Sequence, residues 1–152
     1  MSIGKATSQS CSLMLRRWEK NLDLTCLEKS QLAGELKTLN RQIYRLSNRH
    51  IRVTVFGKVG VGKSSLLNAL VEKQYFATDI AHGCTRKTAG VIWEKPINNL
   101  DTIELVDTPG IDEIAAKARE RLASRIALNS DFILFVLDSD ITSLEVDALN
   151  AL

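Results

Sequence analysis

The chain has 152 residues, enough for one domain with its own core together with a shorter appendage. A content of 45% apolar and 25% charged residues with a net charge of +2 is ordinary for a globular protein, and the longest apolar runs, such as "FILFVL", are too short to cross a bilayer. Because the first twenty residues lack the sustained apolar stretch of a secretory signal, we expect a cytoplasmic protein.

Residues 1–50 contain no proline and predict a helical N-terminal segment. Apolar side chains recur at alternating spacings of four and three, as on one face of an amphipathic helix, at Leu32, Leu36, Leu39, Ile43 and Leu46. An earlier stripe of the same kind comprises Leu15, Trp18 and Leu22. Asp, Thr and Ser between the two stripes predict a break or a new helix cap. We expect this segment to act as an adaptor or dimerisation arm and to carry no chemistry.

The same segment is the basic part of the chain. Residues 1–50 hold nine Lys or Arg against four Asp or Glu, whereas residues 51–152 hold eleven against fourteen. A basic segment can meet RNA, and hence the ribosome, or an anionic membrane surface. A solvated helix face explains the charge equally simply, and it is the interpretation we favour.

From Ile51 onward the pattern alternates between strands and helices. Strands are predicted for the runs "IRVTVF", "TAGVIWEK", "TIELVD" and "FILFVLD", the first and last of them buried, with "PINN" as the turn between the middle two. Helices are predicted at residues 63–73 and 113–128, with a further one starting at Ser143. Residues 74–88 have no clear period and predict a long exposed loop. This alternation predicts an α/β fold with a parallel or mostly parallel sheet.

The stretch "FGKVGVGKSS" between the first strand and the first of these helices has the spacing of a phosphate-binding loop. Gly57, Gly62, Lys63 and Ser64 match the pattern G-x-x-x-x-G-K-[ST]. Glycines let backbone N–H groups turn inward around phosphates, and the helix that follows adds its positive end. Lys63 is expected to reach the β- and γ-phosphates, and the Ser64 hydroxyl to bind Mg²⁺. The predicted nucleotide-binding residues are Lys58, Val59, Gly60, Val61, Gly62, Lys63, Ser64 and Ser65.

A second motif, "VDTPG", follows about forty residues later. Asp107 ends an apolar strand, where its carboxylate is predicted to lie beside the Mg²⁺ and to act through water. Gly110 is predicted to offer its N–H to the γ-phosphate and to reorient when that phosphate leaves.

The runs "GKVGVGKSS", "GCTRKTAG" and "VDTPGID" together resemble the translation-factor-like GTPases, and within them the bacterial Era and TrmE class. The resemblance covers residues 51–152 and implies a Ras-like G domain of the P-loop NTPase fold, with Mg²⁺ as cofactor and GTP or GDP as ligand. It implies that Thr85 closes over Mg²⁺ and the γ-phosphate, with Thr88 as the alternative, so that Lys63, Thr85 and Gly110 serve catalysis and Ser64, Thr85 and Asp107 bind the metal.

Two positions depart from relatives of this kind. Ile111 stands where Ras carries the glutamine that orients the attacking water, so hydrolysis should be slow unless an activating protein or a second copy in a homodimer supplies a group. Gly60 stands where the TrmE group usually has an asparagine linked to potassium activation, so dependence on potassium is not expected.

The family's guanine-specifying segment, [NT]-K-x-D, does not occur after "FILFVLD". We therefore expect a partial G domain over residues 51–152, as in a fragment of a longer protein, with a C-terminally incomplete sheet that exposes apolar side chains of "FILFVL". Base preference then depends on the resemblance. The leading hypothesis is a GTP-binding switch with slow, Mg²⁺-dependent hydrolysis. The alternatives are a nucleotide-dependent phosphotransferase or ATPase, and a module that holds nucleotide without turning it over.

Overall fold

The computed structural model describes residues 3–78, 88–95 and 97–152. The chain forms two compact units. One contains the chain up to His50 together with the short segment that ends at Thr102, and the other contains the remaining residues from Ile51 onward.

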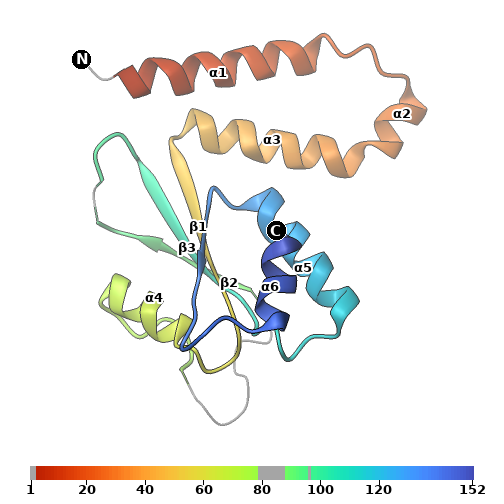
Figure 1. Ribbon diagram of the computed structural model, residues 1–152. Helices are drawn as coiled ribbons and strands as arrows, with labels where there is room; N and C mark the ends of the chain where they lie inside the picture. Colours follow the sequence, from red (N-terminus) through yellow and green to blue (C-terminus); the bar gives the residue numbers. More distant parts are fainter. Residues whose placement is uncertain (1–2, 79–87, 96) are drawn as a thin grey trace. The chain divides into compact units, whose positions relative to one another are not determined.

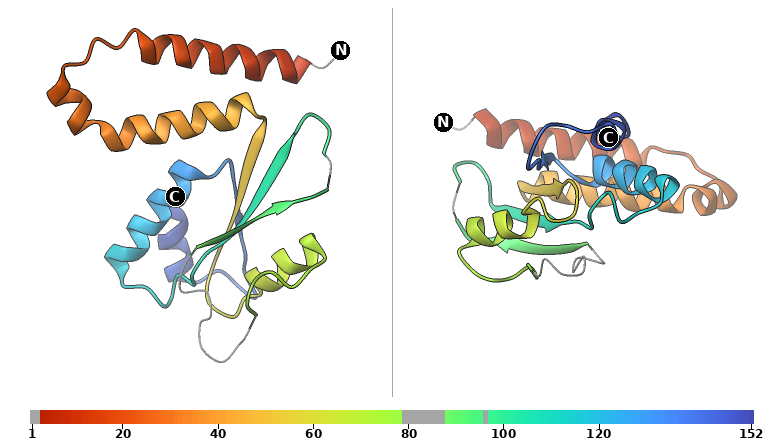
Figure 2. Two further views of the ribbon diagram at one scale, coloured as in Figure 1. Left: turned by 180° about the vertical axis from the view of Figure 1, so that it is seen from behind. Right: turned by 60° about the horizontal axis from the view of Figure 1, so that its bottom comes forward.

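The first unit is a pair of long helices joined by a short one. Helices α1 (Ile3–Lys20) and α3 (Ala33–Ser47) run antiparallel and lie side by side, and α2 (Cys26–Gln31) connects them (Figures 1 and 2). The predicted break is confirmed, because Thr25 caps α2 through a capping box with Glu28. Across the pair, the Ser8 hydroxyl donates to the Leu46 carbonyl over 2.6 Å.

The apolar stripes of this unit are covered only in part. Ile43 is fully buried, and Leu36 and Leu39 are half-buried. Trp18, expected on the packed stripe, has 54% of its surface exposed, and Leu32 and Leu46 are exposed as well. The helices are therefore as predicted, whereas the burial of Trp18 is not.

The second unit is built on a four-stranded sheet in the order β2-β3-β1-β4. The strands are β1 (His50–Phe56), β2 (Ala89–Trp93), β3 (Thr102–Asp107) and β4 (Phe132–Phe135). β1 and β4 are parallel, as predicted, whereas β2 and β3 are antiparallel. Strands joined by a short connection pair in this way, since a parallel pair needs a long crossover. The sheet is therefore mixed within the expected α/β fold.

Helices flank both faces of this sheet. α5 (Ala116–Asn129) and α6 (Ser143–Asn150) lie together on one face, and α4 (Lys63–Val71) lies on the other (Figures 1 and 2). The predicted helices are confirmed, with ends shifted by up to three residues. α6 begins with a capping box between Thr142 and Glu145.

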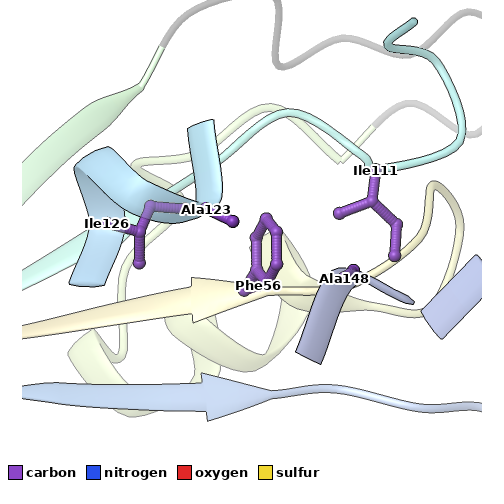
Figure 3. Packing of buried hydrophobic residues seen from close by; sticks show 5 residues of the cluster. All are labelled: Phe56, Ile111, Ala123, Ile126 and Ala148. Carbon is purple, nitrogen blue, oxygen red and sulfur yellow. The ribbon is translucent and has the colours of Figure 1, made fainter. Parts of the chain in front are cut away.

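A compact apolar cluster joins the sheet to α5 and α6. The ring of Phe56, at the end of β1, has Ala123 and Ile126 of α5 on one side, and Ile111 and Ala148 on the other (Figure 3). The cluster therefore lies next to the point where β1 ends and the glycine-rich loop begins.

Strand β4 differs from its predicted burial. It spans four residues, and Phe132 is 61% exposed while Leu134 is also exposed. β4 is the last strand in the sheet order among the described residues, so one side of it is uncovered there. The prediction of a buried strand is wrong for this chain, and the expected exposure of the "FILFVL" side chains is confirmed. Within the described residues, no helix combines the length and the apolar character that crossing a membrane requires.

Candidate nucleotide-binding site

The predicted phosphate loop lies between the end of β1 and the start of α4. The backbone of Gly60 (φ +80°) and Gly62 (φ +87°) is left-handed, a conformation that glycine adopts readily and other residues rarely do. Gly62 is the residue before α4, and helix hydrogen bonding starts with its carbonyl, which accepts the Leu66 N–H over 2.8 Å. The loop thus leads into the positive end of a helix, as phosphate binding requires.

Lys63, the first residue of α4, keeps its ammonium group largely out of water. The residue is 7% exposed, and its Nζ donates to the carbonyl oxygen of Lys58 within the loop. Burial lowers the pKa of Lys63, and the negative charges of Asp107, Asp112 and Glu113 offset this in part. A partly dehydrated cation at the base of the loop would be stabilised by a bound anion.

Ser64 and Asp107 join the two motifs. The Ser64 hydroxyl donates to Asp107 Oδ2 over 2.5 Å, and Asp107 Oδ1 accepts the N–H of Thr108 over 3.0 Å. Asp107 is fully buried at the end of β3. A serine hydroxyl and a carboxylate in contact form a pair of hard oxygen donors of the type that Mg²⁺ prefers.

The segment after Asp107 closes on the phosphate loop. Ile111 N–H donates to the Gly57 carbonyl over 3.2 Å, and Val59 N–H donates to Asp112 Oδ1 over 2.8 Å. Gly110 approaches the loop so closely that a Cβ added to it would lie 2.6 Å from Val59 N. The predicted γ-phosphate contact, Gly110, therefore stands directly beside the predicted phosphate loop.

Residues 52–152 match the family described as 50S ribosome-binding GTPase. The chain belongs to this GTPase family. The resemblance to the Era and TrmE class, and with it the P-loop G-domain fold, is confirmed.

Relatives of known identity agree with this assignment. The chain is 39% identical over 127 residues to GTPase Der of Campylobacter curvus, and the match covers 80% of this chain and 26% of that protein. It is 38% identical over 116 residues to the tRNA modification GTPase MnmE of a Thermotoga species, covering 73% of this chain and 24% of that protein. The chain thus spans about a quarter of the length of these curated relatives.

A solved structure shares the fold. A dimerization-deficient mutant of Toc33 from Arabidopsis thaliana superposes with a TM-score of 0.51 and 25% identity, over 76% of this chain and 48% of the other. Toc33 in complex with Mg²⁺ and GMPPNP gives the same TM-score at 24% identity, over 85% of this chain and 52% of the other.

The remaining predicted residues of the GTPase domain take different places. Val61 is half-buried, and Ser65 lies exposed in the first turn of α4. Thr85 lies outside the described residues, as does most of the predicted loop around it. Its alternative, Thr88, is exposed just before β2. Ile111 is 0% exposed, and its side chain lies in the apolar cluster with Phe56 and Ala148, while its backbone N–H contacts the loop (Figure 3).

Two carboxylates at this site were not predicted. Asp112 accepts the Val59 N–H, and Glu145 of α6 forms an ion pair with Lys58, with 3.0 Å between Nζ and Oε2. Asp112 stands in the run "DTPGID", where its place after the glycine could have drawn attention. Glu145 ends the run "TSLE", which marks a capping box but gives no sign of a second partner in the phosphate loop.

Proposed function

We propose that this chain binds GTP and GDP together with Mg²⁺, and that it acts as a molecular switch with slow hydrolysis. The observation that carries the proposal is the 2.5 Å contact between Ser64 of the phosphate loop and Asp107 of the second motif. It brings a hydroxyl and a carboxylate together at the start of α4, where the helix favours a bound phosphate.

The phosphate loop is proposed to bind the nucleotide mainly through its backbone. The N–H groups of residues 58–65 surround the phosphates, with Ser65 at the α-phosphate. Lys63 moves its ammonium from the Lys58 carbonyl to the β- and γ-phosphates. Its burial supports this role, because an anion next to the ammonium compensates for the lost hydration.

Mg²⁺ is proposed to be held by Ser64 directly and by Asp107 through water, with Thr85 as a further ligand. The described residues contain no cluster of three or more His, Cys, Asp or Glu suited to a metal. A magnesium ion that takes most of its ligands from phosphates and water fits such a sparse protein contribution. When bound, the ion neutralises charge on the phosphates. The complex of Toc33 with Mg²⁺ and GMPPNP supports the same combination of ligands for this chain.

Slow hydrolysis is proposed because of Ile111. A buried aliphatic side chain cannot orient an attacking water, so full activity requires a group from an activating protein or from a second copy of the chain. The existence of a dimerization-deficient Toc33 mutant makes a homodimer the first arrangement to test. Ile111 also supports one alternative function, a module that holds nucleotide without turnover.

Other features of the proposal depend on the family or on the sequence. The preference for guanine follows from membership of a GTPase family, with residues 51–152 as the nucleotide-binding part. Residues 1–50 are proposed as an adaptor or dimerisation arm. Association with RNA, the ribosome or a membrane surface is tested only by the hydrolysis assay with and without ribosomes or vesicles. A cytoplasmic location agrees with this function.

The test measures nucleotide binding by the 152-residue chain. Binding of a fluorescently labelled GDP is monitored in the presence of Mg²⁺, and unlabelled GTP, GDP and ATP serve as competitors. Lys63→Ala should weaken binding roughly 10- to 150-fold, because a charge-assisted hydrogen bond contributes about 1.5–3 kcal/mol. Ser64→Ala should remove the effect of Mg²⁺ on affinity.

Lys73→Ala and Ser124→Ala are matched controls, since both side chains are exposed outside the loop. Single-turnover hydrolysis of GTP, with and without ribosomes or vesicles, separates a slow GTPase from a module without turnover. Parent-like binding by Lys63→Ala, or a parent chain that binds neither GTP nor GDP, would contradict the proposal.

A further inference from the structure

The ion pair between Lys58 and Glu145 connects the phosphate loop to helix α6. Lys58 Nζ lies 3.0 Å from Glu145 Oε2, and the Glu145 side chain is only 1% exposed. The phosphate-loop pattern places no demand on the side chain at position 58, and the proposed function uses only the backbone of Lys58. The side chain therefore forms a buried contact that phosphate binding alone does not require.

Glu145 is held in one position by several donors. Thr142 donates to Glu145 Oε2 through its backbone N–H over 2.8 Å and through its hydroxyl over 2.6 Å. These bonds lower the pKa of Glu145, and the Lys58 ammonium lowers it further. Glu145 is also the third residue of α6, where the helix dipole favours a negative charge. The carboxylate is thus a fixed anchor for Lys58.

Helix α6 is itself packed against both halves of the site. Ala148 lies in the apolar cluster with Phe56, two residues before Lys58, and with Ile111, the residue after Gly110 (Figure 3). A shift of α6 would therefore strain the backbone on both sides of the proposed phosphate position, because close-packed side chains transmit displacements.

The other end of this connection is Lys63. The carbonyl of Lys58, whose side chain is anchored by Glu145, accepts the hydrogen bond from Lys63 Nζ. We propose that Lys58 and Glu145 are positioning residues that couple α6 to the phosphate loop, so that the ion pair sets where Lys63 lies and nucleotide binding is transmitted to α6. This inference rests on the proposed function, and it assigns a regulatory helix to the same site.

The test uses Lys58→Met, Glu145→Gln, the double variant and the control Asp147→Asn, all in the 152-residue chain. Glutamine at position 145 can still complete a capping box, so Glu145→Gln removes the charge and keeps the start of α6. Asp147→Asn removes an exposed carboxylate from the same helix. Dissociation constants for Mg²⁺-GDP and Mg²⁺-GMPPNP are measured by fluorescence, and hydrogen exchange is followed with and without nucleotide.

Each single variant should raise the dissociation constant for GMPPNP at least about fivefold, the lower end of typical coupling between sites. The double variant should lose no more affinity for GMPPNP than the single variant with the larger loss, because the two residues act as one unit. In the parent and in Asp147→Asn, nucleotide should slow exchange of the α6 amides, whereas in Lys58→Met this protection should disappear. Without nucleotide, Lys58→Met should exchange faster at residues 59–63 than the parent.

Additive losses in the double variant, or parent-like affinity together with parent-like exchange in Lys58→Met, would overturn the coupling. If Glu145→Gln fails to fold, Lys58→Met alone decides, since it leaves both Thr142 bonds to Glu145 intact. A parent chain that binds no nucleotide would refute the proposed function, while the nucleotide-free exchange of residues 59–63 would still test the ion pair.

Discussion

Gly110→Ala tests how closely the second motif is packed on the phosphate loop. A methyl group at this position would lie 2.6 Å from the Val59 backbone nitrogen, and closer still to a methyl group of the Val59 side chain. Nonbonded carbon atoms pack best at roughly 3.5 Å, so the backbone at Gly110 has to move about 1 Å away from Val59. A backbone nitrogen cannot rotate away from the contact as a flexible side chain can.

The expected loss of stability follows from the contacts that such a shift disturbs. Overpacking costs roughly 1–3 kcal/mol. The Ile111–Gly57 and Val59–Asp112 hydrogen bonds lie on either side of Gly110, and each contributes about 0.5–1.5 kcal/mol. We therefore expect a decrease of about 2–6 kcal/mol in the free energy of unfolding of the nucleotide-free unit, a large share of the 5–15 kcal/mol that is usual.

The assay is denaturant unfolding followed by circular dichroism, with Gly90→Ala as the matched control. A methyl group on Gly90 meets a side-chain oxygen of Glu104, which can move away, so this variant should stay within about 0.5 kcal/mol of the parent. Adding Val59→Ala to Gly110→Ala should restore part of the loss, because it removes the side-chain clash and leaves the backbone clash. A Gly110→Ala variant as stable as the control would refute the reasoning.

Three further predictions concern neighbouring residues. Lys63→Met should stabilise the nucleotide-free chain and make its free energy of unfolding depend less on pH in the alkaline range. Because burial lowers the pKa of Lys63 below 10.5 in the folded state, the unfolded state binds more protons between the two pKa values, and the stability of the parent rises with pH there. Denaturant titrations at several pH values will test this. Ile111→Gln should cost about 1–3 kcal/mol by burying an amide, and single-turnover assays should find no faster GTP hydrolysis. Asp107→Asn should raise the Mg²⁺ concentration needed for GTP binding roughly 10- to 100-fold, as loss of an outer-sphere partner does, and an unchanged Mg²⁺ titration would count against its role.

The phosphate loop and its helix could be predicted because their determinants are local. A run of β-branched residues, glycines that allow a positive φ, and the start of a helix at Lys63 all stand within about fifteen residues of sequence. The sequence also predicted that Ser64 and Asp107 lie near each other, because both residues were expected beside the same Mg²⁺. The direct hydrogen bond between their side chains is added by the structure.

Burial was predicted less well than secondary structure. The apolar patterns of α1 and β4 identify the faces that are suited to packing against another element. They do not show whether the described residues provide an element that covers those faces. Trp18 and Phe132 remain more than half exposed for this reason. Ile111 shows the converse case, because its position in a catalytic motif drew attention to water and not to the apolar cluster that its side chain fills.

The two unpredicted carboxylates show why motif positions that accept any residue are still constrained in a particular chain. The pattern leaves positions 58 and 59 free, and a lysine followed by a valine there has no evident meaning. In the folded unit, Glu145 holds the side chain at position 58, and Asp112 holds the N–H of position 59. These partners come from a helix and a loop far along the chain, so no local pattern reveals them. The loop therefore contacts charged groups that the sequence alone would assign to the surface, and we expect its response to nucleotide to depend on elements that contribute no residue to the motif.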